Sequence, residues 1–197
     1  MYKKCKRAID LILAVIALII LSPLFLILPF VIKADSPGPV LFRQKRVGMG
    51  NTYFNILKFR TMRMDTPENT PTRKLNHPEQ YITRVGKFLR RTSLDELPQL
   101  FNIIRGQMSF VGPRPVLWNE YDLIVEREAY GINKVRPGLT GLAQISGRDA
   151  LSAGTKAKVD ALYVKNISFT LDFMCIYKTI GKVLRHDGVV EGGRGSI

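Results

Sequence analysis

The sequence predicts a mostly helical α+β protein in which an N-terminal re-entrant membrane helix-break-helix precedes a small β-hairpin and amphipathic interfacial helices. Residues 11–32 contain no charged side chain, and about 20 apolar residues suffice for a membrane helix. Residues 40–47 and 53–62 have the composition of strands and flank the turn-forming residues 48–51. Much of the remaining chain has the periodicity of helices.

The composition limits the chemistry that the chain can perform. Its 197 residues carry a formal net charge of +14 and include two cysteines and two histidines, which fits one catalytic domain plus an anchor. The positive charge predicts an anionic partner, and nucleic acid, lipid head groups and a phosphorylated substrate all satisfy it. Cys5 and Cys175 lie far apart, which predicts neither a disulfide framework nor a zinc site. Carboxylates, lysines and arginines must therefore carry the chemistry.

We interpret residues 1–35 as a re-entrant membrane anchor. Pro23 removes the hydrogen bond to the Ile19 carbonyl, so a break is expected at Ser22-Pro23, and the Ser22 hydroxyl is close enough to bond that carbonyl. Basic residues flank the apolar run on both sides. Because positive flanks prefer the cytoplasm, a helix that returns to its starting side satisfies both. A kinked single span is the alternative, whereas a signal peptide is disfavoured because no small-residue cleavage site follows.

Residues 36–187 are predicted to form a cytoplasmic catalytic domain at the membrane interface, and residues 188–197 a flexible tail. Lys58 and Arg60 share one face of the second strand with apolar neighbours. Residues 65–81 are polar and rich in proline, so we expect a surface loop without a catalytic role.

Several helices are expected after this loop. The first contains Val85, Phe88 and Leu89 on one face and basic residues around them, which suits a membrane surface. In the last helix an apolar stripe is more typical of a protein core than of membrane contact. The stripe comprises Met174, Tyr177, Ile180 and Leu184, and the later helices are expected near residues 98–105, 115–130, 153–165 and 171–186.

The acidic pair Asp95-Glu96 lies where two local rules conflict. Ser93 and Glu96 match a capping box, but Pro98 would remove the bond to the Leu94 carbonyl in a helix that began at Ser93. The helix must start late or start strained, and local rules are often broken where function requires it. One carboxylate could attack while the other holds a divalent cation; an ordinary well-capped helix is the alternative.

Three arginines lie beside proline residues, which restrict the backbone, or glycine residues, which allow it unusual conformations. A planar guanidinium binds phosphate oxygens in pairs, and a rigid loop lowers the entropy lost on binding. Together with two acids, such loops favour phosphoryl-transfer chemistry. They are Gly112-Pro113-Arg114-Pro115, Arg136-Pro137-Gly138 with Gly141, and Gly147-Arg148.

Five motifs are specific enough to indicate a family. They are the apolar segment with Ser22-Pro23, Lys58-Phe59-Arg60-Thr61-Met62, Ser93-Leu94-Asp95-Glu96-Leu97-Pro98-Gln99-Leu100, Ser109-Phe110-Val111-Gly112-Pro113-Arg114-Pro115, and Arg136-Pro137-Gly138-Leu139-Thr140-Gly141. With them the chain resembles the small monotopic phosphoglycosyl transferases, also called bacterial sugar transferases. The resemblance extends from the N-terminal lysines to about His186.

The resemblance implies a ping-pong transfer of a phosphosugar from a UDP-sugar to polyprenyl phosphate. Asp95 would attack the β-phosphate, forming a phosphosugar-aspartate and releasing UMP, while Glu96 would ligate Mg²⁺. Direct attack by the lipid phosphate is the rival mechanism. The candidate phosphate contacts are Lys58, Arg60, Arg90, Arg114 and Arg148. Arg114 and Arg148 are the favoured ones, and contact with lipid head groups is the alternative for Lys58 and Arg60. Asp160 and Asp172 are expected to cap helices or form structural ion pairs.

The implied partners are the UDP-sugar, polyprenyl phosphate and membrane lipids, without nucleic acid. The implied location is the cytoplasmic face of the inner membrane, in the first membrane step of glycoconjugate assembly. The sequence identifies neither the sugar nor the oligomeric state. A non-catalytic basic scaffold that binds anionic lipid or nucleic acid is the alternative from another class.

Overall fold

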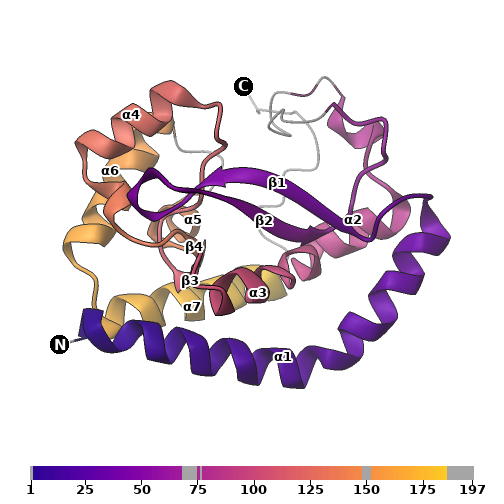
Figure 1. Cartoon of the computed structure of the whole chain (residues 1–197), viewed down its shortest axis with the longest axis horizontal. Coiled ribbons are helices and arrows are strands. Elements are labelled where there is room, and N and C mark those ends of the chain that lie inside the picture. The colour runs from indigo at the N-terminus through magenta and orange to yellow at the C-terminus, as the bar shows by residue number, and fades with distance from the viewer. Residues whose placement is uncertain (1, 68–74, 76, 148–151, 186–197) are drawn as a thin grey trace.

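The computed structural model describes residues 2–67, 75, 77–147 and 152–185. Helices predominate, and they accompany an antiparallel hairpin and a short parallel strand pair (Figure 1). The mostly helical fold with a small hairpin is thus confirmed. The elements are α1 (Tyr2–Asp35), β1 (Leu41–Val47), β2 (Tyr53–Phe59), α2 (Arg84–Arg91), α3 (Gln99–Ile104), β3 (Ser109–Val111), α4 (Tyr121–Ala129), β4 (Gly138–Thr140), α5 (Leu142–Ser146), α6 (Ala153–Lys165) and α7 (Phe169–Leu184).

Helix α1 is continuous rather than divided into two helices. It changes direction along its length in Figure 1, with Pro23 in its interior. The Ser22 hydroxyl donates a hydrogen bond of 2.8 Å to the Ile19 carbonyl, the carbonyl that Pro23 leaves without its helical donor. The predicted local compensation is confirmed, and it accompanies a helix that bends without interruption. The re-entrant break stays a prediction.

Both halves of α1 pack against the rest of the chain. In the first half, Ala14 is fully buried in a cluster that includes Leu100 and Ile103 of α3. In the second half, Leu28 and Ile32 pack with a cluster that includes Phe59 of β2 and Leu89 of α2. The opposite face is apolar and exposed. It comprises Leu11, Ile12, Ile16, Ile19, Ile20, Leu26, Ile27 and Phe30.

The predicted hairpin is confirmed. Strands β1 and β2 pair antiparallel from Leu41 opposite Phe59 to Val47 opposite Tyr53, although the second strand ends at Phe59 and not at Met62. Asn102 of α3 fixes the helix to this hairpin, because its side chain accepts a bond of 3.0 Å from the Leu57 amide and donates one of 2.8 Å to the Asn55 carbonyl. These two hydrogen bonds hold α3 against the hairpin.

A parallel pair, β3 and β4, was not predicted from the sequence. Ser109 lies opposite Gly138 and Val111 opposite Thr140, and strands this short carry no readable period. The two glycine-containing loops approach closely at this point. A Cβ on Gly138 would lie 2.1 Å from the Gly112 nitrogen, so only glycine fits there.

The later helices take part in two ion pairs, one buried and one partly buried. Arg127 of α4 lies 3.2 Å from Asp160 of α6, and Asp172 of α7 lies 2.6 Å from Lys6 of α1. Tyr163 also donates a 2.7 Å bond to Asp172. The expectation of structural ion pairs for both aspartates is confirmed, and the second pair joins the two ends of the chain.

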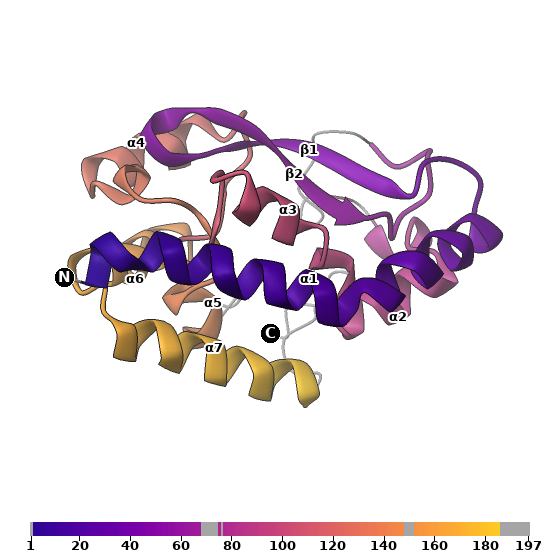
Figure 2. The same ribbon diagram turned by 60° about the horizontal axis from the view of Figure 1, so that its bottom comes forward.

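The interpretation of the apolar stripe on α7 as core is wrong for three of its four residues, whereas Met174 packs against the core cluster that contains Cys175. Tyr177 is 71% exposed and Leu184 73% exposed, and Ile180 is also exposed. The helix has apolar residues on two faces, and the face inside the molecule is the one that contains Cys175 and Ile176. Helical periodicity therefore could not identify which face is buried. Figure 2 shows α7 beside α1 along the same side of the molecule.

Candidate active site

The acidic pair lies in a strained turn between α2 and α3. Ser93 has φ 57° and ψ 16°, a left-handed conformation that serine rarely adopts, and its side chain makes no capping bond. A single 3-10 turn, Leu94–Glu96, follows, and α3 begins after Pro98. The helix thus starts both late and strained, as the position of Pro98 predicts. The capping box does not form.

The strained turn places Asp95 inside the protein and Glu96 at its surface. Asp95 is 7% exposed, and Lys58 of β2 lies 3.9 Å from its Oδ2. Glu96 Oε1 lies 2.7 Å from the same ammonium and 3.4 Å from the Arg114 guanidinium. One lysine therefore bridges the two adjacent carboxylates, and the Gly-Pro-Arg-Pro loop places Arg114 beside them.

The environment of Asp95 raises the pKa of its carboxyl above the usual range. Burial is the largest cause, and the adjacent charge of Glu96 acts in the same direction. Lys58, Arg90 and Arg114 oppose this shift through their positive charges. Three cations thus act on one buried carboxyl group.

The other predicted phosphate contacts lie in different places. Arg90 acts on Asp95 by charge and donates a bond of 2.8 Å to Thr61. Arg60 is 5% exposed, and its guanidinium donates to the Ser36 and Pro37 carbonyls at 2.5 and 2.8 Å. It therefore stabilises the turn after α1 and does not belong to the cluster around Glu96.

The remaining arginine loops are not part of the described site. Arg136 donates a bond of 2.8 Å to the Gly106 carbonyl, so it joins two loops instead of facing the acids. Arg148 lies outside the described residues.

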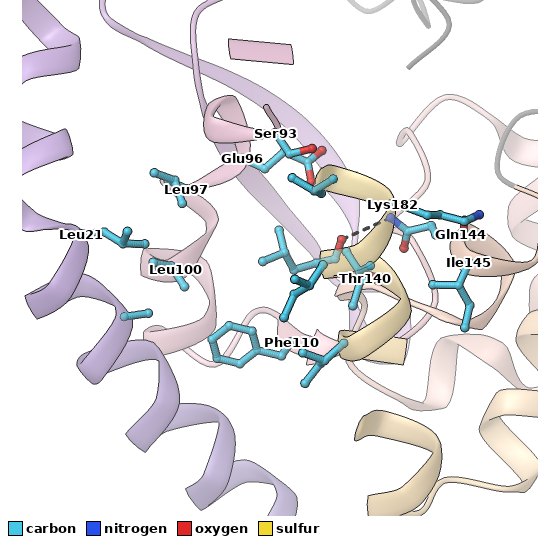
Figure 3. Close-up of a pocket in the computed structure, with 16 residues that line it drawn as sticks. Leu21, Ser93, Glu96, Leu97, Leu100, Phe110, Thr140, Gln144, Ile145 and Lys182 are labelled. Carbon is cyan, nitrogen blue, oxygen red and sulfur yellow. Dashed lines mark hydrogen bonds between the residues drawn. The ribbon is translucent and has the colours of Figure 1, made fainter. Parts of the chain in front are cut away.

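An apolar cavity of about 240 Å³ opens beside the acidic pair. Its walls come from the acidic turn and from α1, α3, β3, β4, α5 and α7. Figure 3 shows Glu96 and Ser93 toward one end and Phe110 toward the other. Ten of its 16 lining residues are apolar, and among these described residues Glu96 is the one acid and Lys182 the one base. The cavity suits a ligand with an apolar body and a charged end.

Sequence reasoning predicted Glu96 but missed other polar residues of this cavity. Thr140, Gln144 and Lys182 line it from three different elements. One signal was available for Thr140: the motif Gly138-Leu139-Thr140-Gly141 belongs to the same family pattern as the acidic motif. Lys182 had no signal, because it belongs to none of the five family motifs.

The carboxylate of Glu96, with Asp95 adjacent, is the group in this site that could contribute oxygen ligands to a metal ion. Among the described residues there is no group of three or more histidines, cysteines or acids that could enclose a metal. Mg²⁺ commonly uses one or two carboxylates plus the phosphates of its substrate. Glu96 at the cavity mouth, with Asp95 adjacent, offers this donor set.

Comparison with known proteins identifies the family. Residues 1–186 match the family model of the bacterial sugar transferases. The chain is 42% identical over 194 residues to the exopolysaccharide production protein ExoY of Sinorhizobium fredii, covering 90% of this chain and 84% of that protein.

Longer relatives match through only part of their length. The undecaprenyl-phosphate galactose phosphotransferase of Salmonella typhimurium is 38% identical, over 93% of this chain and 41% of its own. The undecaprenyl-phosphate glucose phosphotransferase of Komagataeibacter xylinus is 41% identical, over 89% of this chain and 35% of its own. The site contains a buried aspartate among cations, with an apolar cavity beside it. Since the family model also matches nearly the whole chain, the protein belongs to the bacterial sugar transferase family.

Proposed function

We propose that the protein transfers a phosphosugar from a UDP-sugar to polyprenyl phosphate and releases UMP. One observation carries the proposal: Asp95 and Glu96 stand between a group of cations and an apolar cavity. Cations suit the diphosphate of a nucleotide sugar, and an apolar cavity suits a lipid acceptor. The names of the relatives, undecaprenyl-phosphate phosphotransferases for galactose and glucose, agree with this substrate pair.

In the first half-reaction Asp95 is the nucleophile. Its carboxylate forms a bond to the β-phosphorus of the UDP-sugar, the bond from that phosphorus to the bridging oxygen breaks, and UMP leaves. Lys58 favours the ionised form of the attacking carboxylate, because its charge lowers the Asp95 pKa and opposes the larger effect of burial. Arg114, half exposed beside Glu96, can contact the departing phosphate.

In the second half-reaction the acceptor phosphate attacks the same phosphorus. An oxygen of polyprenyl phosphate forms the new diphosphate bond, and the bond to Asp95 breaks, which restores the carboxylate. No net proton transfer is needed between two phosphate oxygens. The covalent intermediate divides one difficult displacement into two easier ones.

We also propose that Glu96, with Asp95 beside it, holds Mg²⁺. The cation supplies positive charge that offsets the repulsion between an attacking carboxylate and a diphosphate. Removal of divalent cations by a chelator is therefore expected to abolish UMP release, and Mg²⁺ to restore it.

The same proposal includes a re-entrant anchor. The N-terminal part of α1 is held by the Lys6–Asp172 ion pair at 2.6 Å, and its last residue, Asp35, accepts a bond of 2.9 Å from the Val85 amide of α2. A straight helix of 34 residues would be about 50 Å long, more than the roughly 30 Å of hydrocarbon. A crossing helix would have to release one of these contacts, so a helix that returns to its starting side explains the packing better.

The active site would then lie at the membrane surface. Helices α1 and α7 run along one side of the molecule (Figure 2), and each has exposed apolar side chains. Both helices contribute to the wall of the apolar cavity. The basic flanks of α1 favour the cytoplasmic face of the inner membrane. This position fits a first membrane step in glycoconjugate assembly.

A product assay tests the reaction. Protein in nanodiscs is incubated with Mg²⁺, polyprenyl phosphate and each of a panel of UDP-sugars, and UMP is measured. A non-catalytic scaffold would release none with any sugar. With donor alone, we expect a covalent phosphosugar adduct in the wild type and none in Asp95→Asn. An adduct in that variant would exclude Asp95 as nucleophile, while turnover without any wild-type adduct would support direct attack by the lipid phosphate.

Labelling tests the anchor. Cys5 is exposed on the N-terminal flank, and an Ala34→Cys substitution adds a thiol at an exposed position on the other flank. Each thiol is probed separately with a membrane-impermeant maleimide, using Cys5→Ser as the background for position 34. Labelling of both flanks from the cytoplasmic side alone is expected, whereas labelling from opposite sides would establish a single span.

A further inference from the structure

The apolar cavity has a cation at its mouth that the reaction described above does not use. Lys182 of α7 lines the cavity together with Glu96, and Figure 3 places both toward the same end. The Lys182 ammonium makes one contact with the described residues, a bond of 3.5 Å to the Gln144 carbonyl. A bond of this length is weak, so the ammonium can turn to a ligand at small cost.

The other cations near Glu96 and Asp95 lie outside the cavity wall. Lys58 lies 2.7 Å from Glu96, and Arg114 lies 3.4 Å from it. Neither lines the cavity. An anionic ligand in the cavity is therefore close to the negative charge of Glu96. Among the described residues of the cavity wall, Lys182 is the one whose side chain is positive and can offset that charge.

We propose that Lys182 binds the phosphate of the lipid acceptor and positions it for attack on the phosphosugar-aspartate. This inference rests on the proposed function and assigns the apolar cavity to the acceptor. The ten apolar lining residues contact the first part of the isoprenoid chain, and the ammonium contacts phosphate oxygens that do not form the new bond. The donor diphosphate approaches from the side of Lys58 and Arg114.

The placement of Lys182 on α7 gives this role a physical basis. The neighbouring Ile180 and Val183 line the same cavity, while Tyr177 and Leu184 expose the apolar stripe on the outer face of the helix. A lysine stem can lie along apolar surface while its ammonium reaches a polar end. The helix therefore offers an apolar wall for the lipid chain and a cation for the phosphate within two turns.

The test compares two half-reactions in nanodiscs of fixed lipid composition. The variants are Lys182→Met, Lys182→Arg and, as a matched control, Lys178→Met, which removes an exposed lysine one turn earlier on the same helix. The first half-reaction is read as UMP released in a single turnover without acceptor. The second is read as kcat/KM for polyprenyl phosphate, at a saturating concentration of the UDP-sugar.

For Lys182→Met we expect kcat/KM for polyprenyl phosphate to fall by about ten- to a hundredfold, the loss typical of a charge-assisted hydrogen bond. UMP release without acceptor should be unchanged. Lys182→Arg should recover most of the acceptor kinetics, and Lys178→Met should behave as the wild type. A misfolded variant would lose both half-reactions, and Lys182→Gln, which also removes the charge, then replaces Lys182→Met in the comparison.

Three outcomes would overturn the inference. An unchanged kcat/KM for the acceptor in Lys182→Met would show that Lys182 is not needed. Slower UMP release in a folded Lys182→Met protein would assign the lysine to the donor. Loss of the Lys182→Met effect in wholly zwitterionic nanodiscs would assign it to anionic phospholipid. A wild type that releases no UMP would instead refute the proposed function.

Discussion

Replacing Lys58 with methionine should shift the pH at which the enzyme becomes active. In the proposed mechanism the Asp95 carboxylate must be ionised to attack; burial raises its pKa, whereas Lys58 lowers it. Removing the ammonium therefore raises that pKa further, and the acid limb of the activity profile moves to higher pH. Methionine preserves the length of the lysine stem, so the main change is loss of charge.

The separation of the two groups sets the size of the shift. Lys58 Nζ lies 3.9 Å from Asp95 Oδ2. At this separation Coulomb's law gives about 1 kcal/mol with the dielectric constant of water and about 4 kcal/mol with an effective value of about 20. One pH unit corresponds to about 1.4 kcal/mol, so the acid limb should move upward by about one to three pH units.

The assay is the pH dependence of kcat/KM for the UDP-sugar, which reports ionisations in the free enzyme. Lys58 is also a candidate phosphate contact, so its removal can lower the maximal kcat/KM. The pH of the inflection in the profile still reports the ionisation of Asp95. Lys45→Met is the control, since Lys45 lies on the neighbouring strand and its ammonium faces the Tyr53 and Trp118 rings. An inflection that stays in place or moves to lower pH in Lys58→Met would refute this account of Asp95.

Three further substitutions test the packing around the site. Asp160→Asn leaves buried Arg127 without its partner at 3.2 Å and should cost about 3–5 kcal/mol; the double variant Asp160→Leu/Arg127→Met should recover most of this in thermal unfolding. Ser93→Gly should keep the melting temperature, while Ser93→Val should lower it by the equivalent of about 1–2 kcal/mol, because φ is 57° at this position. Asp172→Asn should raise hydrogen exchange at the start of α1 by weakening its contact with Lys6 at 2.6 Å, and equal exchange in both proteins would contradict this.

Local signals predicted the hairpin and the acidic turn. Alternating residues around a glycine turn are sufficient to predict β1 and β2, and the conflict between Ser93 and Pro98 predicted the strained start of α3. Both features depend on residues within a few positions of each other. The prediction of adjacent catalytic acids likewise needed no long-range information.

Features that depend on distant contacts could not be predicted from the sequence. The cavity combines side chains of the acidic turn and of α1, α3, β3, β4, α5 and α7, so no local pattern indicates it. Strands β3 and β4 are three residues each and pair across 29 positions of sequence, from Ser109 to Gly138. The buried face of α7 was misassigned because apolar residues occupy both of its faces.

The continuity of α1 follows from contacts that the sequence pattern does not contain. Pro23 removes one helical bond, which the Ser22 hydroxyl partly compensates at the Ile19 carbonyl, and packing of both halves on the same body stabilises the helix further. Pro23 thus permits the helix to bend, while tertiary contacts fix its course.

These contacts also connect α1 to the segment that carries Asp95 and Glu96. Leu100 lies in one core with Ala14 of α1 and also lines the cavity beside Glu96. Leu97, two residues after Asp95, packs against the cluster that contains Leu28 and Ile32. Both halves of α1 support the segment that carries the acids, so in the proposed membrane arrangement the depth of α1 would fix the distance of Asp95 from the bilayer. A change that tilts α1 without unfolding it should therefore impair transfer to the lipid more than release of UMP from the soluble donor.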